Sequence, residues 1–104
     1  MLSLPIKKKW YDMITSGEKK EEYREIKPYY KARFKSNGLL DASGKPTDKR
    51  TQITLRNGYS RFSPETVATV HLDVGTGNPD WGAVNGKQYF ILKIDCIDKI
   101  ISNK

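Results

Sequence analysis

The chain has 104 residues, of which 37% are hydrophobic and 30% are charged. These values are typical of one globular domain, residues 1–104, that can bury a core without disulfides or bound metal. Nineteen lysines and arginines against twelve acids give a net charge of +7, and the surplus lies in residues 1–65, since residues 66–104 carry four of each. An anionic partner is favoured, most commonly nucleic acid, although lysines also serve solubility alone.

The scarce residue types exclude several kinds of site. Cys96 and His71 are the only cysteine and histidine, which rules out a disulfide framework, a cysteine zinc site and a two-histidine metal motif. We expect no metal and no cofactor. No apolar window reaches membrane-spanning length and no signal peptide is visible, so we expect no membrane contact and a cytoplasmic location. The oligomeric state is open, with a monomer as the default.

Two elements are predicted before residue 17. Apolar residues alternate over residues 2–6, which indicates a short strand, and Pro5 places it at the edge of a sheet. Residues 8–16 follow the helical period, and Gly17 suits the position after a helix end. The apolar face of this helix consists of Trp10, Met13 and Ile14.

The segment from residue 17 to residue 25 holds four acids, three bases and one tyrosine. We interpret residues 19–26 as a strand with two polar faces, since neither face is apolar enough for an ordinary core. One face would hold Lys20, Glu22, Arg24 and Ile26, and the other Lys19, Glu21, Tyr23 and Glu25. A buried charge on either face must be paired, and Glu22 with Arg24 is the predicted pair.

Pro28 opens a predicted second helix that runs through Phe34. Tyr30 and Phe34 are spaced to face the core, whereas Tyr29 and Arg33 share the next face. Residues 36–50 are rich in turn-forming residues and indicate a long, mobile loop. Its expected apolar anchors are Leu39 and Leu40.

Three further strands are predicted, over residues 51–56, 67–74 and 89–97, with a turn at Asn57-Gly58 and a two-residue hairpin turn at Asn85-Gly86. The alternation places Cys96 in the core as a small apolar residue, and His71 on the outer face. Five or six strands with two early helices and no regular β-α alternation indicate an α+β fold. We expect a small mixed, mostly antiparallel β-barrel.

The pattern Gly17-x-Lys19-x-x-Glu22-x-Arg24, directly after an amphipathic helix, resembles the signature of the ASCH domains. These are small α+β barrels related to the PUA RNA-binding fold. The order of elements is similar over most of the chain, apart from residues 36–50. The resemblance implies a PUA-like barrel with a cleft between the barrel and the early helices, lined by the signature residues.

The resemblance also implies two possible activities. Family members are proposed to bind RNA, and some are reported as amidohydrolases on acetylated cytidine or as ribonuclease-type enzymes. Lys19 matches the lysine of the amidohydrolases, but Glu22 stands where they have a threonine nucleophile. A carboxylate does not simply replace a hydroxyl as the acyl acceptor.

Three hypotheses follow for these residues. In a binding module, basic side chains hold phosphates and tyrosines stack an unpaired base of RNA or of a nucleotide. In a hydrolase acting on RNA or on a modified nucleoside, Lys19 and Glu22 are the catalytic residues. In the third, the charges form a structural salt-bridge network without a ligand. The candidate ligand-binding residues are Lys7, Lys20, Tyr23, Arg24, Arg56, Asn57 and Tyr59, with Lys19 also able to contact phosphate.

Overall fold

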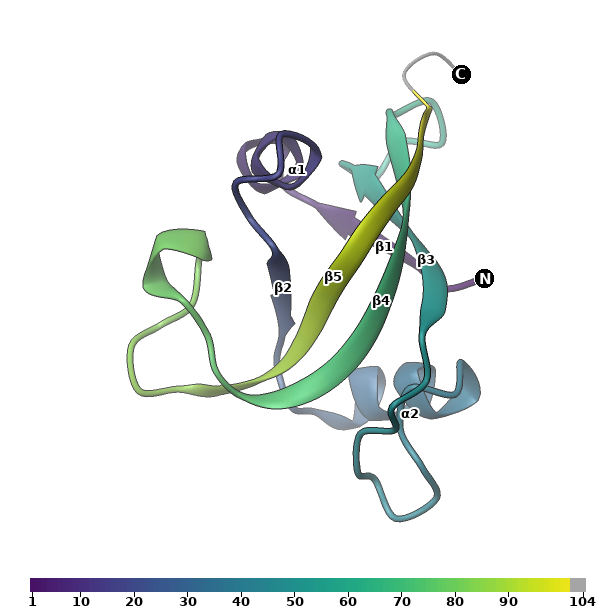
Figure 1. The fold of residues 1–104 in the computed structure, drawn as a ribbon, viewed down its shortest axis with the longest axis vertical. Coiled ribbons are helices and arrows are strands. Elements are labelled where there is room, and N and C mark those ends of the chain that lie inside the picture. The colour runs from purple at the N-terminus through teal and green to yellow at the C-terminus, as the bar shows by residue number, and fades with distance from the viewer. Residues whose placement is uncertain (102–104) are drawn as a thin grey trace.

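A computed structural model describes residues 1–101. The fold is a compact α+β domain with two helices and one five-stranded sheet (Figure 1). Strand β1 parallels β3, and the other neighbouring strands are antiparallel, in the order β1-β3-β4-β5-β2. The elements are β1 (Ser3–Ile6), α1 (Lys8–Thr15), β2 (Glu21–Arg24), α2 (Pro28–Ser36), β3 (Thr51–Asn57), β4 (Glu65–Thr76), the 3₁₀ turn η1 (Pro79–Trp81) and β5 (Gln88–Ile101).

The expected closed barrel is not confirmed. Strands β1 and β2 form the two edges of the sheet, have four residues each, and are not paired with each other within residues 1–101. A side chain crosses the gap instead, because Nη2 of Arg24 on β2 donates to the carbonyl oxygen of Pro5 on β1 at 2.9 Å. The two edges therefore come close without forming a ladder.

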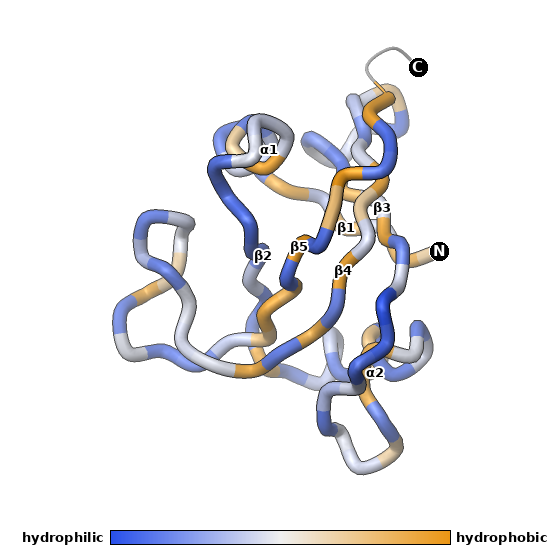
Figure 2. The backbone as a smooth tube through the Cα atoms, viewed as in Figure 1, coloured by the Kyte–Doolittle hydropathy of each residue, from blue (hydrophilic) through white to orange (hydrophobic). Residues whose placement is uncertain are grey.

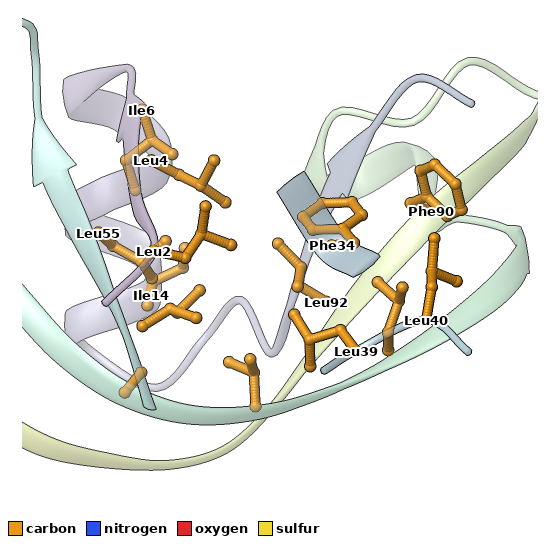
Figure 3. Packing of buried hydrophobic residues seen from close by; sticks show 14 of the residues in the cluster. Leu2, Leu4, Ile6, Ile14, Phe34, Leu39, Leu40, Leu55, Phe90 and Leu92 are labelled. Atoms are coloured by element: carbon orange, nitrogen blue, oxygen red, sulfur yellow. The ribbon is translucent and has the colours of Figure 1, made fainter. Parts of the chain in front are cut away.

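The core fills the curved face of the sheet, and the helices close its two ends. Figure 1 shows α1 and α2 at opposite ends, joined by β2. Tyr11 and Ile14 of α1 are buried at one end, and Phe34 of α2 is buried at the other. Phe34 meets Phe90 of β5 edge to face, with ring centroids 5.2 Å apart, in a cluster with leucines (Figure 3). Both predicted helices are confirmed, but of the three residues that were predicted to face the core from α1 only Ile14 is buried.

The segment between α2 and β3 is anchored as expected, since Leu39 and Leu40 are buried. The Asp41 carboxylate accepts hydrogen bonds from the backbone N–H groups of Ser43 and Lys45, which turns the chain back on itself. An isolated bridge between Leu40 and Pro46 follows from that turn. The mobility of this segment stays a prediction.

The prediction that Cys96 lies in the core is wrong. The register of β4 and β5 shifts between Thr69 and Val70, so that Val70 pairs with Ile94 but Thr69 pairs with Cys96. One extra residue, Asp95, is accommodated there, as in a β-bulge, and it reverses the side on which the following residues lie. Cys96 is consequently exposed, and its Sγ lies 3.2 Å from the Asp98 carboxylate.

Asn85-Gly86 forms a turn, closed by a hydrogen bond from the Lys87 N–H to the Val84 carbonyl at 3.1 Å, but the prediction that it is a two-residue hairpin connection is wrong. Strand β4 runs to Thr76 and β5 begins at Gln88, so a longer connection that contains η1 joins them. This connection, residues 77–87, is called the η1 loop below. It turns toward β2, where Tyr23 Oη accepts a hydrogen bond from the backbone N–H of Asn78 at 2.8 Å, and toward α1, where Gly82 lies against the Trp10 ring.

Candidate functional site

A tight turn after α1 places Lys19 inside the protein. Gly17 follows the helix with φ of 87°, and the backbone N–H of Lys19 donates to the carbonyl of Met13 at 2.9 Å. Strand β2 begins only at Glu21, two residues later than the predicted alternation needs. Lys19 is therefore buried, at 2% exposure, on the same side as Glu22, and Lys20 is exposed. The predicted division of these residues between two faces is wrong for both lysines.

Lys19, Glu22 and Arg24 form one buried ion-pair network. The Glu22 carboxylate accepts from Lys19 Nζ at 3.0 Å through Oε1 and from Arg24 Nη2 at 2.8 Å through Oε2. The side chains of the three residues are 1%, 8% and 13% exposed, in the order Lys19, Glu22, Arg24. The sequence-based pairing of Glu22 with Arg24 is confirmed, and Lys19 completes it. Figure 2 shows the hydrophilic character of the chain where it passes from α1 into β2.

The Lys19 ammonium group contacts four other residues. Besides Glu22, it donates to the carbonyl oxygen of Trp81 in the η1 loop. It also lies 4.4 Å from the ring centroid of Trp10 and 5.3 Å from that of Tyr23, within cation-π range. Through these contacts Lys19 connects α1, β2 and the η1 loop.

Burial shifts the pKa values of Lys19 and of the neighbouring Tyr23. Desolvation lowers the pKa of Lys19 below its ordinary value, against the attraction of Glu22, and the nearby Arg24 adds to the lowering. Burial also raises the pKa of the Tyr23 hydroxyl, and the bond that it donates to Glu21 at 2.7 Å adds to the rise. Tyr23 therefore stays a neutral phenol, held between Glu21 and the η1 loop.

A cavity of about 380 Å³ opens above this network. Its walls come from the end of β1, the start of α1, strand β2, the turn after β3 and the η1 loop. Four bases and one acid line it. We call it the cleft; it is lined by Pro5, Ile6, Lys7, Lys8, Trp10, Lys19, Glu22, Tyr23, Arg24, Gly58, Tyr59, Trp81 and Gly82.

The first turn of α1 adds to the positive character of the cleft. No side chain caps this helix end, and its first turn contains no acid. Free N–H groups at a helix start carry a partial positive charge that favours anions. Lys7 and Lys8, which line the cleft, occupy this same turn. Cations at a helix start do not stabilise the helix, so these two lysines serve the positive cleft wall and not α1.

Tyr59 is the most exposed aromatic residue at the cleft, at 88%. It follows Gly58, whose φ of 99° turns the chain after β3. Because its ring packs against little of the protein, its free face is open to a planar ligand. Phe62 in the same turn is 64% exposed but does not line the cleft.

The structure brings together six of the predicted site residues in the cleft and leaves out three. The six are Lys7, Lys19, Glu22, Tyr23, Arg24 and Tyr59. Lys20 is exposed beyond the cleft wall, and Asn57 ends β3 outside it. Arg56 is directed to Glu65 on β4, with both Nε and Nη2 at 3.0 Å from Oε1. Arg56 thus links β3 to β4 through an ion pair and does not line the cleft.

Sequence reasoning missed both tryptophans as cleft residues. Trp10 belongs to the helix face that we assigned to the core, but Tyr11 and Ile14 form the buried face. Trp81 reaches the cleft through the η1 loop, which folds back onto Lys19 and Tyr23. Gly82 allows the approach, because a Cβ atom there would lie 3.0 Å from the Trp10 ring.

Two kinds of feature are absent from residues 1–101. No three His, Cys, Asp or Glu side chains gather there in a way that could hold a metal ion. No helix in that range has the length and apolar character needed to cross a membrane.

Comparison of the chain with models of known protein families, with curated proteins and with solved structures found no match in any of the three.

Proposed function

We propose that this protein binds RNA, or a nucleotide, in the cleft between α1, β2 and the η1 loop. The observation that carries the proposal is the composition of the cleft wall: four bases against one acid, with a freely exposed tyrosine. Nucleotides combine a phosphate anion with a planar base, and both parts have a complement here.

The chemistry divides between the two sides of the cleft. Lys7, Lys8 and the free N–H groups of the α1 start would hold a phosphate group. Tyr59 would stack the base. Arg24 adds positive charge to the cleft wall. Glu22 is already shared by two cations, so it is assigned to holding the wall in place rather than to base recognition.

The test is RNA affinity as a function of salt in variants matched in pairs. Lys7 and Lys9 are both exposed lysines two positions apart, but only Lys7 lines the cleft. We expect Lys7→Ala to flatten the plot of log affinity against log salt by about 0.7, the value for one phosphate contact with a single strand. Lys9→Ala serves as the control and should leave the slope unchanged.

A second pair of variants tests the proposed stacking of a base on Tyr59. Tyr59→Ala should weaken binding by about 1–3 kcal/mol, the usual value for one stacked base. Phe62→Ala changes an exposed ring in the same turn that lies outside the cleft, so it should have little effect. Absence of any RNA or nucleotide binding at low salt, or equal effects within both pairs, would refute the proposal.

One observation favours a second candidate, hydrolysis of RNA or of a modified nucleoside. Lys19 has a pKa lowered by burial and contacts the Glu22 carboxylate, as expected of an acid–base pair in a catalytic site. Incubation with RNA oligomers and with acetylated nucleosides, followed by product analysis, tests it. Turnover that is lost in Lys19→Met would support catalysis, whereas turnover that is equal in the variant would assign the activity to another site or to a contaminant.

We also propose that the domain is of the ASCH type and that its sheet is a PUA-like barrel left open between β1 and β2. The support is the signature pattern of Lys19, Glu22 and Arg24, together with their position on a cleft wall beside α1. The approach of the two sheet edges through Arg24 and Pro5 supports the relation to a barrel.

A further inference from the structure

Helix α2 carries the densest run of exposed positive charge outside the cleft. Residues 26–40 contain four bases, Lys27, Lys31, Arg33 and Lys35, and no acid. All four side chains are exposed. None of them takes part in an ion pair formed within residues 1–101, whereas Arg24, Arg50 and Arg56 each contact a carboxylate. This run holds a large part of the uncompensated charge of the protein.

The arrangement of these bases on α2 is regular. Lys27, Lys31 and Lys35 recur every fourth residue, so they lie along one side of the helix with a rise of about 6 Å between neighbours. Only Phe34 of this helix is fully buried, so most of the helix surface faces outward. A line of evenly spaced cations complements the regular phosphates of a nucleic-acid strand.

A planar surface lies on the other flank of the exposed side of α2, since Tyr29 and Arg33 are two residues out of step with the lysines. Tyr29 is 49% exposed, and the Arg33 guanidinium lies 4.2 Å from its ring centroid. Tyr30 fixes the Tyr29 ring from the side, edge to face at 5.0 Å. Unpaired bases stack on aromatic rings and on arginine planes of this kind. The surface thus offers contacts to both parts of a single strand.

The α2 surface is joined to the cleft wall through one residue. The Tyr30 hydroxyl accepts a hydrogen bond from Arg24 Nη1 at 3.3 Å, and the Lys27 ammonium lies 5.5 Å from the Tyr30 ring centroid. Cations therefore follow one another from Arg24 in the cleft to Lys27 at the start of α2. A polymer, but not a single nucleotide, is long enough to use both surfaces.

We propose that the exposed side of α2, with Lys27, Lys31 and Lys35 on one flank and Tyr29 and Arg33 on the other, is a second binding surface, for the backbone and an unpaired base of single-stranded RNA. The choice of RNA rests on the function proposed for the cleft. The ligand of the protein is accordingly an oligonucleotide that extends beyond the nucleotide in the cleft.

The test compares two variants that lose the same charge. The α2 variant is Lys31→Ala with Arg33→Ala and Lys35→Ala, and it should fold normally because alanine is the best helix former at exposed positions. The control is Lys87→Ala with Lys93→Ala and Lys99→Ala, which removes three bases from β5 and the loop before it. Thermal unfolding followed by circular dichroism checks that both variants are folded.

Binding of an unstructured RNA of about 12 nucleotides, within the site sizes of small single-strand binding folds, is measured against salt. We expect the α2 variant to bind it more weakly, with a slope shallower by about 1.4, from the loss of the two phosphate contacts of Lys31 and Lys35 at about 0.7 each. A mononucleotide should bind the α2 variant and the unmodified protein equally. Equal RNA binding by the α2 variant and the charge-matched control would overturn the proposal.

The cleft variant Lys7→Ala with Tyr59→Ala, measured in parallel, separates failure of this proposal from failure of the proposed function. If only the cleft variant weakens RNA binding, the cleft function stands and the α2 surface is excluded. If only the α2 variant weakens RNA binding, the α2 surface stands as an RNA-binding surface and the cleft is excluded.

Discussion

Replacement of Glu22 by glutamine tests how the cleft wall is held together. The Glu22 carboxylate contacts Lys19 at 3.0 Å and Arg24 at 2.8 Å, and its side chain is 8% exposed. The amide keeps the shape of the side chain but removes the charge, and its NH₂ group would face one of two cations that only donate. Removal of one partner from a buried ion pair costs about 3–5 kcal/mol, so we expect a loss of that size in the free energy of unfolding.

Urea unfolding measures this loss, with Glu25→Gln as the control. Glu25 is close in the chain and has a side chain that is 59% exposed, opposite Lys87 at 3.7 Å. Its replacement should change stability by no more than about 0.5 kcal/mol. Lys19→Met and the double variant complete a cycle, which should give a coupling of about 0.5–3 kcal/mol between Lys19 and Glu22. A cost for Glu22→Gln as small as that of the control would refute the buried network.

Three other predictions concern the surroundings of the network. The pKa of Lys19 is lowered in the folded protein. Between that lowered pKa and the ordinary value of 10.5, the unfolded chain holds the proton and the folded protein does not. The free energy of unfolding should therefore rise with alkaline pH up to about pH 10, and Lys19→Met should abolish the rise. Gly77→Ala should cost about 1–3 kcal/mol in urea unfolding, because its Cβ would lie 2.7 Å from the Tyr23 ring, whereas Gly75→Ala meets only an ordinary contact at 3.6 Å. Cys96 is exposed, so a thiol reagent should modify it in the folded protein about as fast as in urea, and slow modification would contradict the register shift beside it.

Local patterns in the sequence were enough to predict most of the elements. The helix from Lys8 and its end before Gly17 follow from apolar spacing and glycine chemistry, and the structure confirms both. The same holds for Pro28 at the start of α2 and for the pair of Glu22 with Arg24. These features depend on residues that are close together in the chain.

Features that depend on distant residues were not predicted. Lys19 faces inward because the turn after α1 delays the start of β2, and alternation from residue 19 cannot reveal that delay. Cys96 faces outward because a bulge reverses the alternation within β5. Trp81 enters the cleft because the η1 loop docks on Lys19 and Tyr23. In each case a tertiary contact overrides the local period.

The most direct measurement of the central claim is the response of the two indole N–H signals to RNA in proton–nitrogen correlation spectra. Trp10 and Trp81 are the only tryptophans, and both line the cleft. Titration with a short single-stranded RNA should shift both signals along with the backbone signals of Lys7 and Tyr59. Saturable RNA binding that leaves both indole signals in place, or no binding at low salt, would contradict the assignment of the cleft as the RNA site.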